Sequence, residues 1–152
     1  MQVHPTTLGI MLELLGDGFR LDHLYGIWMT QGTEGHYMHA VENAAAYYRV
    51  DAGSTIRCGM CMCSWQLTDQ REGDGGFAAI PGSHKRNFRA PDSLIKATDH
   101  WNALQQAVAP AGSLIIFTEN LLHGTLPWKA AHERRTVLFK YGNVSTGDLP
   151  KF

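Results

Sequence analysis

The stretch Ser113 to Tyr141, SLIIFTENLLHGTLPWKAAHERRTVLFKY, decides how this chain is interpreted. Its pattern predicts an apolar strand, a polar bend that carries His123, a loop with Pro127 and a second strand that begins at two arginines. Arg134 follows His123 by eleven positions. A histidine followed by a strand-borne arginine is what a metal site needs when it also binds an anionic co-substrate.

The composition limits the class of protein around this stretch. With 152 residues, the chain is expected to form one domain over residues 1–152. Thirteen Lys and Arg face fourteen Asp and Glu, so the partner is expected to be a small molecule or a protein and not nucleic acid or an anionic membrane. Sixteen glycines and 10% aromatic residues favour a strand-rich fold with tight turns. Eight histidines are more than a structural role requires, which makes a metal worth testing.

The cysteines and the absence of targeting patterns predict the compartment. No run approaches the roughly 18 apolar residues of a membrane span, and the N-terminus lacks a signal-peptide pattern. Cys58, Cys61 and Cys63 are clustered and odd in number, which suits a reducing compartment. We therefore expect a cytoplasmic protein. On one regular strand Cys58 and Cys61 would face opposite ways, which argues against half a zinc knuckle.

Periodicity predicts six to eight strands with two helices at the periphery. One helix is expected over Pro5 to Leu15 and a longer one from Pro91 to about Val108. Strands are expected in four further segments, which are Phe19 to Met29, Tyr47 to Val50, Ser54 to Thr68 and Phe77 to Ile80.

Two more histidines lie in Gly35 to Glu42, GHYMHAVE. Neither His36 nor His39 is followed two positions later by a carboxylate, since Met38 and Val41 occupy those sites. Two histidines three positions apart would point to different faces of a strand, so only one of them would face an interior metal. A loop with two solvent histidines is the alternative.

Several motifs together resemble one enzyme family. FAAIPGSHKRNF follows a DGG turn, and GSLIIFTENLLHGTLPW is followed by an arginine on the next strand. Over about Gly35 to Tyr141 the chain resembles the phytanoyl-CoA dioxygenase family of Fe(II)- and 2-oxoglutarate-dependent oxygenases. The resemblance implies a mostly β fold, the double-stranded β-helix or jelly-roll barrel also seen in cupins, with about two peripheral helices. It also implies Fe(II) and 2-oxoglutarate as cofactors and a small-molecule substrate.

The resemblance assigns roles to four residues. These oxygenases hold iron by two histidines and a carboxylate and leave three positions for 2-oxoglutarate and O₂. His123 matches the distal histidine ligand, and His39 is preferred as the proximal one. Arg134 matches the arginine that binds 2-oxoglutarate, because its planar fork suits a carboxylate. Thr125 would place a hydroxyl near the co-substrate, or else cap the end of its strand.

Strand alternation supports Arg134 over its neighbour. Arg134, Thr136 and Leu138 share one face of the predicted strand, and Arg135 and Val137 share the other. The argument favours Arg134 as the inward-facing cation.

The chain departs from the family pattern at the third metal ligand. The family shows a His-x-Asp motif, and Val41 stands where the Asp is expected. Glu42 could reach the metal after a local bulge, and His36 is a further candidate ligand. A halide or water could fill the position instead, as in the related halogenases, or the site has lost catalysis.

The segment ahead of the proximal histidine is short. Only 38 residues precede His39, fewer than in most family members. The chain is then a minimal form, a fragment or half of an assembly. An incomplete barrel would expose strand edges and apolar surface, which favours a homodimer.

Three functions remain open on the sequence. The leading hypothesis is an Fe(II)- and 2-oxoglutarate-dependent oxygenase, of the hydroxylase type, that acts on an unknown small molecule. The second is a non-catalytic barrel that binds a small ligand or a partner without turnover. The third, a cupin-like metal enzyme without 2-oxoglutarate, would leave Arg134 without a role.

Overall fold

Two antiparallel sheets form most of the molecule. The computed structural model describes residues 4–40, 48–50, 56–86, 88–96 and 101–143. The first sheet runs in the order β1 (Arg20–Met29), β10 (Arg134–Gly142), β5 (Met60–Gln66) and β8 (Leu114–Thr118). The second runs in the order β2 (His36–His39), β9 (His123–Leu126), β6 (Gly76–Ala79) and β7 (Gln105–Gln106). A separate two-stranded ribbon joins β3 (Tyr48–Val50) and β4 (Ile56–Cys58).

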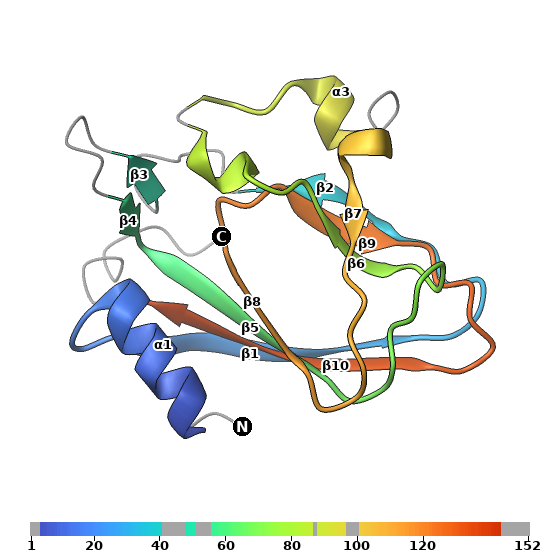
Figure 1. The fold of residues 1–152 in the computed structure, drawn as a ribbon, viewed down its shortest axis with the longest axis horizontal. Helices are drawn as coiled ribbons and strands as arrows, with labels where there is room; N and C mark the ends of the chain where they lie inside the picture. Colours follow the sequence, from blue (N-terminus) through green and yellow to red (C-terminus); the bar gives the residue numbers. More distant parts are fainter. Residues whose placement is uncertain (1–3, 41–47, 51–55, 87, 97–100, 144–152) are drawn as a thin grey trace.

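The two sheets face each other as the layers of a sandwich. Figure 1 shows the first sheet along the lower side of the molecule and the second above it, with β2 and β9 over the ends of β1 and β10. The helix α1 (Pro5–Leu15) lies against the far side of the first sheet, and α3 (Asp92–Ile95) lies beyond the second. Two short 3₁₀ turns, η1 (Ser83–Lys85) and η2 (Trp101–Ala103), complete the described elements.

Three apolar clusters follow from these layers. Between the sheets lie Met62, Phe77, Phe117 and Leu138. The outer face of the first sheet packs under α1 and uses Met11, Leu15, Cys61, Cys63, Phe139 and Tyr141. The outer face of the second sheet uses Met38, Ala90 and Leu122, with Leu94 and Ile95 of α3 packed against them. Strand residues therefore alternate between an inner and an outer core, because successive side chains of a strand leave opposite faces.

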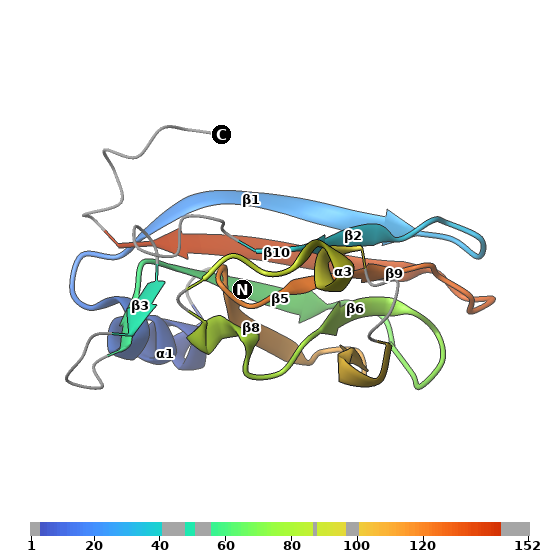
Figure 2. The same cartoon turned by 90° about the horizontal axis from the view of Figure 1, so that it is seen from above.

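The predicted alternation of β10 agrees with this layering. Arg134, Thr136 and Leu138 are buried, whereas Arg135 is exposed. The helix predicted over Pro5 to Leu15 is also present, and Gly16 ends it at a positive φ of 78°. Figure 2 shows β1 and β10 side by side along the length of the sandwich, and nine pairs of residues join them.

The long helix predicted from Pro91 to Val108 is wrong. The α-helix ends at Ile95, and after η2 the chain enters β7. Ala78 and Ala79 of β6 pair with Gln106 and Gln105 there, so tertiary strand pairing overrides the apolar periodicity of this segment. Val108, where the predicted helix was expected to end, is 63% exposed.

The two cysteines expected on opposite faces are neighbours. Cys58 ends β4 and Cys61 lies in β5, with Gly59 between the two strands. The regular alternation is interrupted there, and the two Sγ atoms are 3.3 Å apart. All three cysteines are free thiols. Burial raises the pKa of the Cys63 thiol to about 11, in keeping with a packing role.

One edge of the first sheet is exposed and apolar. β1 is the edge strand, and Leu24 and Trp28 on it are 53% and 66% exposed. Such an edge is a surface on which a further strand or chain could pair. The homodimer remains a prediction, because the structure contains one chain. In the described part of the chain, no helix is both long and apolar enough to cross a lipid bilayer.

Candidate functional site

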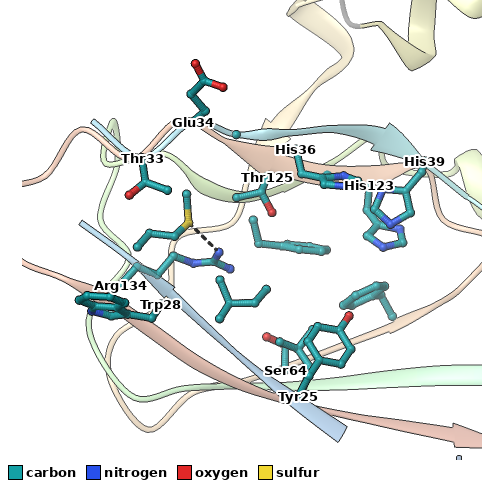
Figure 3. A pocket seen from close by; sticks show the side chains of 17 residues that line it. Tyr25, Trp28, Thr33, Glu34, His36, His39, Ser64, His123, Thr125 and Arg134 are labelled. Carbon is teal, nitrogen blue, oxygen red and sulfur yellow. Dashed lines mark hydrogen bonds between the residues drawn. The ribbon is translucent and has the colours of Figure 1, made fainter. Parts of the chain in front are cut away.

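A cavity of about 440 Å³ opens between the two sheets. Its apolar wall includes Ile27, Phe77, Phe117 and Leu138, which belong to four different strands. Its polar lining consists of Thr33, Glu34, His36, His39, Ser64, His123, Thr125 and Arg134. Figure 3 shows the histidines gathered on one side of this space and Arg134 on the other. A mostly apolar cavity with a few convergent polar groups is the usual form of a small-molecule site.

His39 and His123 are brought together by strand pairing. They are direct partners in the register of β2 against β9, and their ring centroids are 4.4 Å apart. The Nδ1 of His123 bonds the Leu121 carbonyl at 2.7 Å, and the Nδ1 of His39 bonds the Tyr37 carbonyl at 3.1 Å. A carbonyl oxygen can only accept, so each Nδ1 carries a proton, and in the neutral form of either ring the Nε2 is the nitrogen that keeps a lone pair. This is the tautomer that binds metal ions through Nε2.

Burial keeps His123 in the neutral form that a metal requires. Its side chain lies in the wall of the cavity and is 7% exposed. Desolvation, and next the charge of His39, lower the pKa of His123 to about 4. At neutral pH the ring is therefore uncharged and its Nε2 can act as a ligand.

His36 lies on the same side of β2 as His39, contrary to the prediction. His36 pairs with Thr125 and His39 with His123, so three steps along β2 match two steps along β9. The extra residue is a β-bulge, which turns the second histidine back to the face of the first. Both His36 and His39 consequently line the cavity. Strict alternation failed here because the strand is not regular.

Arg134 is a buried cation with unused hydrogen-bonding capacity. It is 2% exposed and lies at the start of β10. In the described part of the chain no carboxylate forms an ion pair with it, its Nε has no partner, and one terminal nitrogen lies 3.3 Å from the Sδ of Met29. Desolvation lowers the pKa of Arg134 to about 10, so the group is still charged at neutral pH. A buried charge without a partner is costly, so this arrangement fits an anionic ligand.

Glycine next to Arg134 makes room for its guanidinium. A Cβ on Gly76 would lie 3.1 Å from the Nε of Arg134 and would clash with the side-chain oxygen of Gln70. Gly76 also has a positive φ of 81°, which other residues rarely adopt. Gln70 is itself fixed, because its side-chain oxygen accepts from the Phe77 N–H at 3.0 Å.

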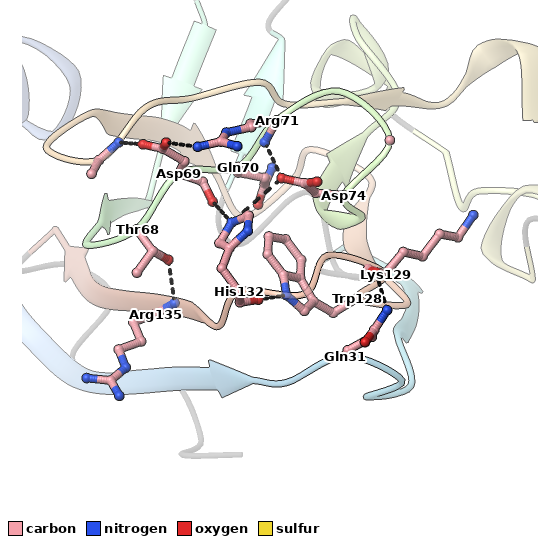
Figure 4. Close-up of polar contacts among 12 residues, drawn as sticks. Gln31, Thr68, Asp69, Gln70, Arg71, Asp74, Trp128, Lys129, His132 and Arg135 are labelled. Carbon is pink, nitrogen blue, oxygen red and sulfur yellow. Dashed lines mark hydrogen bonds and ion pairs between the residues drawn. The ribbon is translucent and has the colours of Figure 1, made fainter.

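The loop that leads into β10 is anchored at several points, which fixes the position of Arg134. Trp128 is 1% exposed and donates from Nε1 to the His132 carbonyl at 2.6 Å. His132 in turn bonds the Asp69 carbonyl at 3.0 Å through Nε2. The Arg135 N–H donates to the Thr68 hydroxyl at 2.9 Å. Figure 4 shows these contacts between the loop and the neighbouring turn, with the Arg135 contact apart from those of Trp128 and His132.

The structure places Thr125 but does not describe every residue that was predicted near the metal. Thr125 lines the cavity, and Figure 3 shows it between the histidines and Arg134. Glu42 and Val41 lie outside the described residues. Within those residues, no three His, Cys, Asp or Glu side chains form a ready-made metal site. His39, His123 and Arg134 therefore line one cavity, and their roles as ligands stay a prediction.

Sequence reasoning missed an ion pair close to the histidines. Glu119 follows β8 and accepts from the Nζ of Lys140 at 3.1 Å, with side-chain exposures of 11% and 19%. Lys140 continues the inward-facing row of β10 beyond Leu138. Alternation in β10 could have placed Lys140 inside, but nothing in the sequence showed that Glu119 would be its partner.

Two facing antiparallel sheets with a cavity of this composition between them define a jelly-roll protein with a small-molecule site. The chain belongs to the phytanoyl-CoA dioxygenase family, whose model, described as Phytanoyl-CoA dioxygenase (PhyH), matches residues 21–136. The predicted family is thereby confirmed. No curated protein sequence matches the chain significantly.

Solved structures confirm the predicted jelly-roll fold. HygX from Streptomyces hygroscopicus, solved with nickel and 2-oxoglutarate bound, is 20% identical, with a TM-score of 0.78 over 94% of this chain and 63% of its own. AviO1 from Streptomyces viridochromogenes Tue57 is 17% identical, with a TM-score of 0.73 over 97% of this chain and 60% of its own. EctD from S. alaskensis, in its apoform, is 20% identical, with a TM-score of 0.68 over 90% of this chain and 49% of its own. The chain thus spans less than two thirds of the length of HygX and of AviO1.

Proposed function

We propose that this chain is an Fe(II)- and 2-oxoglutarate-dependent oxygenase that acts on a small molecule. The observation that carries the proposal is Arg134, a buried guanidinium that faces a cavity and has no carboxylate partner in the described part of the chain. His39 and His123, with free Nε2 lone pairs, line the same cavity. Family membership and the nickel and 2-oxoglutarate held by HygX support the same reading.

Each proposed role follows from the chemistry of the side chain. His39 and His123 would hold the metal through neutral imidazoles, and Arg134 would bind the distal carboxylate of 2-oxoglutarate with two parallel hydrogen bonds. Thr125 lies between the two sites, and its hydroxyl would donate a hydrogen bond to the co-substrate. When bound, Fe(II), 2-oxoglutarate and O₂ together supply oxidative decarboxylation to succinate and CO₂ with oxygen insertion into the substrate.

Exposed residues of the cavity lining indicate where the substrate would enter. Tyr25 and Trp28 of β1 line the cavity and are 41% and 66% exposed. Glu34 adds a carboxylate to the lining, and Figure 3 shows it above Thr33, away from Trp28. Phe77, Phe117 and Leu138 form an apolar interior that excludes water from the metal side. We propose a substrate with an apolar portion that contacts these rings.

The test is an anaerobic titration of the purified protein with Fe(II) and then with 2-oxoglutarate. A visible charge-transfer absorption band should appear only when both are present, and succinate should form when O₂ is admitted. Absence of any band in the wild-type protein, with metal analysis showing no stoichiometric iron uptake, would overturn the proposal.

A second function is favoured by one observation. The absence of a ready-made three-ligand group among the described residues, together with Val41 in the place of the family's Asp, fits a barrel that binds a small ligand without turnover. A non-catalytic barrel should take up no stoichiometric iron, and Val41→Asp should then create metal binding. If the wild-type protein binds iron and forms succinate from 2-oxoglutarate, this second function is excluded.

A further inference from the structure

We propose that Cys58 and Cys61 form a redox-active dithiol, which a small disulfide compound converts into a disulfide within the chain. Cys58 is the thiol that reacts first, and Cys61 is the thiol that closes the bridge. This activity goes beyond the proposed oxygenase function and needs no metal. Its basis is the contact between the two sulfur atoms and the way in which the surrounding strands hold both residues in place.

The two sulfur atoms are in direct contact at the bend between β4 and β5. Their separation is 3.3 Å. A covalent S–S bond is about 2.05 Å long, so the two atoms have to approach by only about 1.3 Å to be joined. Cys63 lies two residues beyond Cys61 in a regular strand, which places it about 7 Å further along the same face. The geometry therefore selects Cys58 as the partner of Cys61.

Backbone hydrogen bonds hold the bend in this shape. The carbonyl of Gly59 accepts from the Asn143 N–H at 3.0 Å, and that of Met60 accepts from the Glu119 N–H at 3.2 Å. Cys61 lies in β5, which is paired with β10 on one side and with β8 on the other. The second thiol is thus held beside the first, and a reaction between groups fixed in this way is favoured over the same reaction between separate molecules.

The two thiols differ in exposure and in acidity. Cys58 is half-buried, whereas Cys61 is 0% exposed. A hydrogen bond from the Cys61 thiol lowers the pKa of Cys58, although burial acts in the opposite direction. The same hydrogen bond, and next burial, raise the pKa of Cys61. The Met60 carbonyl is 3.6 Å from the Cys58 sulfur and holds its proton only weakly at that distance. Cys58 is therefore the accessible sulfur that forms the nucleophilic thiolate.

The reaction is a thiol–disulfide exchange in two steps. The Cys58 thiolate attacks one sulfur of the small disulfide, whose other sulfur leaves as a thiolate, and a mixed disulfide forms on Cys58. Cys61 then attacks the Cys58 sulfur, and its proton passes to the second departing thiolate. One S–S bond of the reagent is broken and one S–S bond of the protein is made. The protein loses two electrons, and the reagent is reduced to two thiols.

The dithiol lies on the outer face of the first sheet. Cys61 packs there under α1 with Met11 and Leu15, and Cys58 is packed against the same cluster. Met62, which follows Cys61, faces the space between the sheets instead. Neither cysteine is among the residues that line the cavity. The disulfide would join the ribbon of β3 and β4 to the first sheet, and thiol exchange can be measured separately from metal binding.

The experiment treats the reduced full chain with glutathione disulfide, stops the reaction with acid, and determines mass and free thiols. The wild-type protein should lose two of its three thiols and carry no glutathione. Cys61→Ala should keep one glutathione on Cys58, and Cys58→Ala should react at least about tenfold more slowly. Cys63→Ala is the matched control and should still form the bridge, which can then join only Cys58 and Cys61. Cys61→Ser, closer to cysteine in size, should give the same adduct as Cys61→Ala, and thermal unfolding should show that the variants are folded.

The pH dependence of alkylation separates a reactive pair from two packed thiols. In Cys61→Ala the reaction of Cys58 with iodoacetamide should move to higher pH, because the hydrogen bond that stabilises the thiolate is lost. A stable glutathione adduct on the wild-type protein, a bridge that Cys63→Ala abolishes, or three thiols that stay free in excess glutathione disulfide would each overturn the dithiol. The titration with Fe(II) and 2-oxoglutarate reports on the proposed function alone, so either can fail without the other.

Discussion

Replacing Arg134 by methionine should change stability and co-substrate affinity in opposite directions. The fall of the Arg134 pKa from 12.5 to about 10 corresponds to a burial cost of about 3 kcal/mol for the charged form. The pKa of Arg134 is lower in the folded state than in the unfolded state. Burial of the charge therefore destabilises the folded protein by its full amount below about pH 10, and this destabilisation disappears only as the pH rises toward 12.5. At neutral pH, without co-substrate, Arg134→Met should therefore be more stable by up to about 3 kcal/mol.

The same substitution should abolish the stabilisation of the protein by 2-oxoglutarate. Two charge-assisted hydrogen bonds at about 1.5 to 3 kcal/mol each predict a loss of affinity of about 10² to 10⁴-fold. Thermal unfolding with and without 2-oxoglutarate measures both effects. At 100 times its dissociation constant the co-substrate should stabilise the wild-type protein by about 2.7 kcal/mol and the variant by almost nothing.

Arg135→Met is the matched control for this measurement. Arg135 is exposed on the other face of β10 and pairs with Glu133, so its loss should change neither stability nor 2-oxoglutarate binding by more than about 0.5 kcal/mol. The reasoning fails if Arg134→Met unfolds at a lower temperature than the wild type and is still stabilised by 2-oxoglutarate. The guanidinium would then be a structural group.

Three further predictions test other parts of the site. Burial lowers the pKa of His123 from 6.5 to about 4. The metal-free protein should therefore lose about 3 kcal/mol of stability as the pH falls from about 6.5 to 4. Urea titrations at several pH values measure this loss, and His123→Gln should make it smaller. Gly124→Ala should weaken Co(II) binding, because its Cβ would lie 2.9 Å from the His36 carbonyl oxygen and 3.0 Å from that of Tyr37 and would force β2 away from β9. Gly9→Ala in α1 meets open space and should gain about 0.5 to 1 kcal/mol. Gln70→Leu should cost about 1 to 3 kcal/mol by chemical denaturation, because it leaves a buried strand N–H without an acceptor; an unchanged midpoint would contradict that role.

Regular strands were the part of the fold that the sequence predicted best. Alternation in β10 placed Arg134 inside and Arg135 outside, because that strand is paired on both sides along most of its length and is free of bulges where it meets β5. The first helix was also predictable, because a proline begins it and a glycine at a positive φ ends it.

Features set by tertiary pairing could not be predicted in the same way. The segment that enters β7 has helical periodicity, but its partners in β6 lie almost thirty residues earlier in the chain. The proximity of Cys58 to Cys61 depends on the interruption at Gly59. The ion pair between Glu119 and Lys140 joins the residue after β8 to β10, and these two strands are not neighbours in the sheet. Each of these is a property of register and not of local composition.

The bulge in β2 has a consequence for how such sites are recognised in sequences. Removing Tyr37 would leave the two histidines two positions apart on a regular strand, and both would still face the cavity. Two histidines three positions apart on a bulged strand and two histidines two positions apart on a regular strand are thus interchangeable by a single insertion or deletion. A search that fixes the spacing between the two histidines will find only one arrangement, whereas a comparison of which residues pair with His123 and Thr125 would find both.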